Sequence, residues 1–164
     1  MPERRMLDFA SMDQIMPDVE RLVEGHRMTG RWTLAQVLYH LATAIRLSTQ
    51  GNADSSFREA SAARRERFFR SRRIAEGRSV PHPSLIPPPH ADLNIQRKAL
   101  QETIEHFLSS TGPFPGHPLL GPLSKDEWHQ FHCIHCAHHL GFAVSHRLNV
   151  NAGTAANGLI TDGG

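Results

Sequence analysis

The sequence has few cysteines, little net charge and no long apolar run. Its two cysteines, Cys133 and Cys136, are too few and too close together for the disulfide framework of a secreted protein. No apolar run approaches the roughly 18 residues of a membrane-spanning helix, and no apolar region follows Arg4 and Arg5 as it would in a signal peptide. These absences predict a cytoplasmic location and no membrane partner.

The length and the apolar content suit one domain with its own core. The chain has 164 residues, of which 39% are hydrophobic, and a domain of this size needs neither disulfides nor a structural metal in order to fold. Histidine, in contrast, is abundant, with 12 copies. Six of them fall within one short stretch: His129, His132, His135, His138, His139 and His146.

The apolar residues recur mainly at helical spacing, and few segments alternate with the period of a strand. This pattern predicts an all-α protein with core helices at about residues 12–25, 33–50, 93–110 and 125–147. Capping-box pairs mark three of the predicted starts: Ser11 with Gln14, Thr33 with Gln36, and Ser124 with Glu127. Gly25 and Gly51 are predicted stops in the left-handed conformation, and Pro17 predicts that the first helix kinks or begins there.

A long connection, residues 54–91, separates the second and third predicted helices. Its prolines exclude a helix over the stretch VPHPSLIPPPH, residues 80–90. A four-helix bundle with a long crossover requires such a connection, while the short gap after the first helix suits antiparallel neighbours. The bundle is predicted to span residues 1–148, and the small, polar residues 149–164 are predicted to form a flexible tail.

The arginine-rich segment, residues 58–78, raises the question of a nucleic-acid partner. On a helical wheel its arginines scatter around the axis, and the whole chain carries a net charge of only +2. No nucleic-acid partner is therefore predicted. A solvated surface is the favoured interpretation, and attraction of an anionic cosubstrate is the alternative.

One stripe of the last predicted helix carries both aromatic and histidine side chains. At about 100° per residue, the same side holds Trp128, Phe131, His132, His135, His139, Phe142 and His146. This stripe should face the bundle interior, because the aromatic residues have the most apolar area to bury. Buried imidazoles are costly unless their nitrogen atoms find partners.

Two of these histidines have the spacing of metal ligands. His135 and His139 are four residues apart on a helix, so their rings can converge on one ion. A third ligand must come from another helix, and His40, at the edge of the apolar stripe of the second predicted helix, is the best candidate. Alternatively, His40 is a lone histidine that binds a carbonyl group or a water molecule.

Other metal and redox motifs fit less well. No glutamate follows His135, as the H-E-x-x-H motif of zinc peptidases requires, and Ala137 stands where a haem-attachment motif needs histidine. Cys133 and Cys136 lie in mid-helix, away from the helix start where a thioredoxin-like pair belongs. Packing in the core is the favoured role of both cysteines. The alternative is that Cys136 joins His132 and His139 in a competing ligand set.

The sequence resembles the DinB/YfiT-like superfamily of metal-binding helical bundles and, within it, a bacterial family of unassigned function. The resemblance covers most of residues 7–147. Its most specific part is H-P-L-L-G-P-L-S-K-D-E-W with the following F-H-C-I-H-C-A-H-H-L-G-F, residues 117–128 and 131–142, and W-T-L-A-Q-V-L-Y-H-L-A matches in the second helix. The resemblance implies a four-helix bundle with a long crossover, often a homodimer, with metal ligands at His40, His135 and His139. Some relatives are implied to be thiol S-transferases and others have been labelled hydrolases.

Three imidazoles would leave a divalent ion with its full charge and an open position, which is the pattern of a catalytic site. Such an ion lowers the pKa of a bound water toward about 7 and deprotonates a bound thiol. Zinc or nickel is expected, although iron and manganese also accept imidazole. His132 and His138 could relay a proton or bind substrate, and packing or hydrogen bonds to the ligands are equally open roles.

Three classes of function therefore stay open. The favoured one is a metal-dependent S-transferase that acts on a small molecule such as a low-molecular-weight thiol, with a metal-dependent hydrolase as its alternative. The second class is a metal-binding or stress-response bundle without catalysis. The third is a structural bundle whose histidines serve only in packing.

Overall fold

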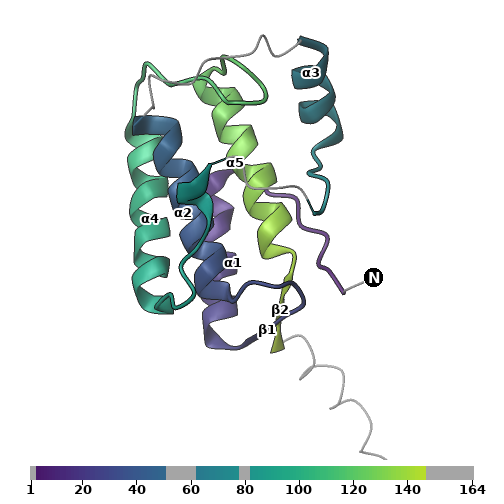
Figure 1. Ribbon diagram of the computed structural model, residues 1–164, viewed down its shortest axis with the longest axis vertical. Helices are drawn as coiled ribbons and strands as arrows, with labels where there is room; N and C mark the ends of the chain where they lie inside the picture. Colours follow the sequence, from purple (N-terminus) through teal and green to yellow (C-terminus); the bar gives the residue numbers. More distant parts are fainter. Residues whose placement is uncertain (1–2, 51–61, 78–81, 147–164) are drawn as a thin grey trace, which may run out of the picture.

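A computed structural model describes residues 3–50, 62–77 and 82–146 of the chain. Most of the described chain is helical, with one short antiparallel sheet (Figure 1). The elements, in order, are η1 (Met12–Gln14), α1 (Ile15–Glu24), β1 (His26–Met28), α2 (Leu34–Gln50), α3 (Ala62–Ser71), η2 (Pro83–Leu85), α4 (Leu93–Ser109), α5 (Lys125–Leu140) and β2 (Ala143–Ser145). No helix in these ranges is both long and apolar enough to cross a membrane.

Helices α1, α2, α4 and α5 form the bundle, and α2 packs along most of α4. Their inner faces are apolar, and the fully buried side chains include Leu22, Leu38, Leu100, Phe107 and Leu140. Four amphipathic helices that bury their apolar faces against one another leave no core surface for a large sheet. The predicted all-α bundle is thus confirmed, with four core helices close to their predicted positions.

Two predicted capping boxes are present at helix starts. Thr33 and Gln36 exchange hydrogen bonds between side chain and backbone at 3.0 and 3.2 Å, and Ser124 and Glu127 do the same. At the first helix the Ser11 hydroxyl accepts from the backbone N–H of Asp13, so no reciprocal pair with Gln14 forms. The helix begins with the 3-10 turn η1, and α1 begins at Ile15.

Pro17 is predicted to kink or start the first helix, and the α-helix begins close to it, at Ile15. It lies in the first turn of α1, where its missing N–H has no partner to lose. Gly25 does end α1, yet its φ of 167° is extended and not left-handed, because the chain turns directly into β1. The other predicted stop, Gly51, lies outside the described residues.

The last helix is shorter than predicted. It ends at Leu140, and Ala143–Ser145 pairs as β2 with β1 instead of continuing to residue 147. Phe142 and His146 therefore leave the predicted stripe, and His146 is exposed. The strand pairing accounts for this early end, since the Phe142 carbonyl accepts from the backbone N–H of Thr29 at 2.8 Å.

The crossover contains the helix α3 and the single turn η2, and the described parts of it contact the bundle. Arg72 donates to the Asp8 carboxylate, and Arg65 donates to the Pro122 carbonyl. Phe68 packs against Phe131 of α5 with a ring-centroid distance of 5.7 Å. No α3 residue is fully buried, as expected for a solvated segment. Residues 51–61 and 78–81, with Arg58 and Arg78, lie outside the described residues, as does the predicted tail, 149–164.

The segment before η1 crosses the C-terminal end of α5 (Figure 1). The Arg5 backbone N–H donates to the Gly141 carbonyl at 2.8 Å, and the Arg5 guanidinium binds both oxygens of the buried Asp18 carboxylate at 2.8 Å. A Cβ at Gly141 would lie 2.9 Å from the Arg5 carbonyl oxygen, so this crossing needs glycine. Nothing in the sequence pattern predicts the crossing.

Candidate metal centre

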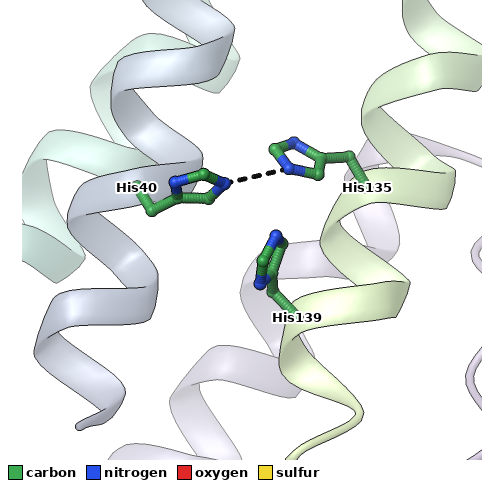
Figure 2. Close-up of side chains that lie close together, drawn as sticks. All are labelled: His40, His135 and His139. Atoms are coloured by element: carbon green, nitrogen blue, oxygen red, sulfur yellow. Dashed lines mark hydrogen bonds between the residues drawn. The ribbon is translucent and has the colours of Figure 1, made fainter. Parts of the chain in front are cut away.

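Helices α2 and α5 bring His40, His135 and His139 together in the bundle interior. His40 projects from α2 toward the other two rings, and one ring nitrogen of His139 points into the space between His40 and His135 (Figure 2). One ligand atom from each of the three histidines lies within 4.8 Å of the others. Of the residues described, these three form a group that could hold a metal ion, as the spacing argument and the resemblance both predict.

The His40 ring is oriented by the crossover. Its Nδ1 lies 2.8 Å from the Leu85 carbonyl oxygen, which can only accept, so Nδ1 carries the proton and Nε2 keeps its lone pair. That Nε2 lies 3.0 Å from Nε2 of His135. Two nitrogen ligands about 2.05 Å from one ion would lie about 3.3 Å apart at the tetrahedral angle of zinc and about 2.9 Å apart at the right angle of an octahedral ion, so the observed 3.0 Å falls within the range of a shared ion.

Burial keeps the three rings neutral, which is the form that binds metal. Burial, followed by the neighbouring His40, His138 and Arg4, lowers the pKa of His139 to about 2. The pKa of His135 falls well below its usual value, mainly through burial and then through His139 and His40. Burial also lowers the pKa of His40, against a smaller opposite effect of the Leu85 carbonyl.

Aromatic rings surround the three histidines. Trp32 stacks on His139 with a centroid distance of 5.7 Å and lies 5.0 Å from the His40 ring. Phe131 lies 5.4 Å from His135 on the other side. Trp32 and His139 are only half-buried, so the centre is nearest to solvent at this pair. The residue type of Trp32 does not indicate a metal site. Its position just before the capping residue Thr33 does, however, place it near the start of α2.

His132 and Cys136 are not members of this group. His132 is fully buried, and its Nε2 lies 2.8 Å from the Ser48 hydroxyl, which itself donates to the Ile45 carbonyl. His132 therefore donates from Nε2 and packs against Trp128 and Phe107.

Cys133 and Cys136 are free and buried in the core. Burial raises the pKa of the Cys133 thiol to about 11 and raises the pKa of the Cys136 thiol further. Their surroundings match the packing interpretation.

His138 lies next to the group and contacts Arg4. Its Nδ1 accepts from Arg4 Nη2 at 3.2 Å, and its ring centroid is 4.8 Å from that of His139. Sequence reasoning found His138 as a neighbour of the ligands but missed Arg4, because residues 4 and 138 meet only through the crossing of the first segment over α5.

The sequence also matches a known protein family along nearly its whole described length. A family described as "Protein of unknown function (DUF1569)" matches residues 1–146. The chain belongs to the DUF1569 family. All residues of the candidate metal centre lie inside the matched range. No curated protein and no solved structure matches the chain.

Proposed function

We propose that this DUF1569 chain binds one divalent metal ion at His40, His135 and His139 and is a metal-dependent enzyme of the thiol S-transferase type. The observation that carries the proposal is the convergence of three imidazoles from two helices, two of them buried and one half-buried, with the pKa of each lowered by burial. His40 Nε2, which the Leu85 contact leaves with its lone pair, faces Nε2 of His135 at 3.0 Å. Such a costly polar cluster is accounted for by a ligand that the rings share.

A divalent ion held there would supply Lewis-acid chemistry and favour the deprotonated form of a small thiol. The residues around it would exclude water and orient the rings, as Leu85 does for His40. Zinc or nickel is the proposed metal, and iron and manganese are alternatives for a donor set of imidazoles alone.

Two observations agree with a small thiol as the substrate, and bound water would suit the same open three-histidine site for hydrolysis. The ligand group contains no carboxylate among the described residues, so the usual general base of a metal hydrolase has no counterpart in it. The protein's own thiols, Cys133 and Cys136, are buried and have a raised pKa, so the reacting thiol would be a separate small molecule. The resemblance to metal-binding DinB/YfiT-like bundles, which also suggests a homodimer, agrees with this proposal.

Metal content tests the ligand set. The untagged wild-type protein and the variants His40→Ala, His135→Ala and His139→Ala are analysed for bound metal, with the exposed His106→Ala as the matched control. We expect one equivalent in the wild type and in the control, and a loss of at least about tenfold in affinity in each ligand variant. Full metal content in all three variants would refute the assignment. Metal-free wild-type protein that takes up none on addition would favour the packing bundle.

Turnover tests the reaction. The metal-loaded protein is assayed with a panel of small thiols and electrophiles, and then with ester and amide substrates, before and after chelation. Thiol transfer that disappears on chelation and in His135→Ala supports the transferase. If only hydrolysis is observed and it disappears on chelation, the protein is a metal-dependent hydrolase and not a transferase. Full metal content without either activity would indicate a non-catalytic metal-binding protein.

A further inference from the structure

We propose that Arg4 and His138 form an anion subsite beside the metal position, so that the small thiol accepted there carries a carboxylate group. This inference rests on the proposed metal function and adds the substrate class. It assigns a role to two residues that the metal centre itself does not use, and it accounts for the position of a guanidinium group beside three imidazoles.

Arg4 is held in place by several contacts. Its Nη2 donates to Nδ1 of His138 at 3.2 Å and to the His138 carbonyl oxygen at 3.3 Å, and its guanidinium carbon lies 4.9 Å from the Phe142 ring centroid. Arg4 Nη1 donates to the Glu76 carboxylate at 3.1 Å. The side chain of Arg4 keeps about a quarter of its surface exposed, at 25%. The cation is thus fixed in direction and accessible from solvent.

The cation lies within electrostatic reach of the metal centre. The rings of His138 and His139 are 4.8 Å apart, and Arg4 Nη2 lies 3.2 Å from Nδ1 of His138. A fixed cation beside a divalent ion makes a positively charged site, whose natural complement is an anionic ligand.

Arg4 also determines which nitrogen of His138 can donate. Because Nδ1 accepts from the guanidinium, a neutral His138 carries its proton on Nε2. Among the described residues that Nε2 has no hydrogen-bond partner, and the side chain is not fully enclosed, with 8% of its surface exposed. His138 therefore holds the guanidinium through Nδ1, and the edge of Arg4 that binds the Glu76 carboxylate is the one that matches the carboxylate of a ligand.

Glu76 identifies the group that an incoming anion would replace. Its carboxylate binds the outer edge of Arg4, and half of its side chain is exposed. An ion pair exposed to this degree contributes little to stability, so a carboxylate anchored at the metal through its thiol can displace it. Removal of the Glu76 charge should accordingly strengthen anion binding.

Cobalt-loaded protein allows binding to be measured without turnover, because cobalt-thiolate binding gives a visible charge-transfer band. Mercaptoacetate and 2-mercaptoethanol are titrated separately, since they differ mainly in carboxylate against hydroxyl. We expect the wild type to bind mercaptoacetate about tenfold more tightly. Arg4→Gln should lose this preference and Arg4→Lys should keep part of it. Arg97→Gln, which removes a half-exposed arginine paired with Glu20, should retain the preference in full.

Glu76→Gln provides the second variant, at an exposed position where folding is not at risk. We expect its affinity for mercaptoacetate to rise about threefold, with that for 2-mercaptoethanol unchanged. The subsite is overturned if cobalt-loaded Arg4→Gln keeps the wild-type preference, or if Glu76→Gln binds both thiols as the wild type does. Failure of the wild type to bind cobalt would instead refute the metal function itself.

Discussion

His40 donates from Nδ1 to the carbonyl of Leu85, at 2.8 Å and 45 positions further along the chain. The crossover thus sets the ring direction of a proposed ligand that α2 carries. The same stretch is tied to α2 a second time, since Gln36 Nε2 donates to the Pro88 carbonyl at 3.1 Å. The affinity for metal should therefore depend on the contact between Gln36 and Pro88, although neither residue is a proposed metal ligand.

Gln36→Glu tests this dependence. The substitution keeps the side-chain oxygen that accepts from the Thr33 backbone N–H, but removes the N–H group that donates to the Pro88 carbonyl. We expect metal affinity to fall by up to about tenfold with stoichiometry unchanged, measured by competition with a chromogenic chelator. Thr33→Ala is the control, because it removes the cap of α2 and leaves the loop contact in place. Equal losses in both variants would mean that helix stability, and not the loop, sets the affinity.

His132 should make stability depend on pH. Burial lowers its pKa to about 3 in the folded protein, against about 6.5 when it is exposed. Between these values the unfolded chain binds a proton that the folded chain does not, so the stability present above pH 6.5 is lost as the pH falls. The loss is about 1.4 kcal/mol per pH unit for this group.

His132→Phe should remove this one-proton contribution. Urea unfolding of the metal-free wild type and variant is compared from pH 7.5 to pH 4.5. We expect the dependence of unfolding free energy on pH to be less steep in the variant by about 1.4 kcal/mol per unit, whatever the offset at pH 7.5. Parallel curves would show that His132 does not stay neutral in the folded protein.

Asp18 should contribute more to stability than any exposed acid. Its side chain is 1% exposed and binds Arg5 through both oxygens, while the Arg5 side chain is 18% exposed. Asp18→Asn leaves that guanidinium without its counter-charge, and we expect a loss of about 3 kcal/mol or more in urea unfolding. Asp8→Asn breaks the exposed pair with Arg72 and should cost at most about 1 kcal/mol. Similar costs for the two variants would contradict the burial argument.

Trp32 should report metal binding directly. The chain has two tryptophans, and Trp32 contacts the rings of both His40 and His139, whereas Trp128 stacks on His132. Copper(II) quenches nearby indole emission, so Trp128→Phe, which keeps Trp32, should lose more fluorescence per equivalent than Trp32→Phe. Stronger quenching in Trp32→Phe would place the ion elsewhere in the bundle.

Helix phase and spacing predicted the pair His135 and His139, and made His40 the best candidate for the third member of the group. His135 and His139 share a face because they are four residues apart, and His40 stands out as a polar residue beside an apolar stripe. The same reasoning failed beyond Leu140, since periodicity alone cannot detect that a strand pairing ends the helix. Pro17 leaves two possibilities open in sequence, a kink or a start, because its effect depends on its distance from the helix start.

The surroundings of the centre could not be predicted, since they depend on contacts between distant segments. The Leu85 carbonyl is a backbone group, so its residue type carries no signal. Arg4 contacts His138 across 134 positions of the chain. A single sequence gives no information about which residues so far apart come into contact. Residues in contact through tertiary packing lack the fixed spacing that makes helical pairs readable.

The crossing of the first segment over α5 has a consequence for the order of synthesis. Arg5 emerges from the ribosome early, but the Leu140, Gly141 and Ala143 carbonyls that it binds are made much later. The Arg5 guanidinium that binds the buried Asp18 therefore gains its own carbonyl partners only once nearly the whole described chain has been translated. Contacts of such long range form late in folding, so a nascent chain stopped before Gly141 would expose an incomplete bundle to the cell's chaperones and proteases.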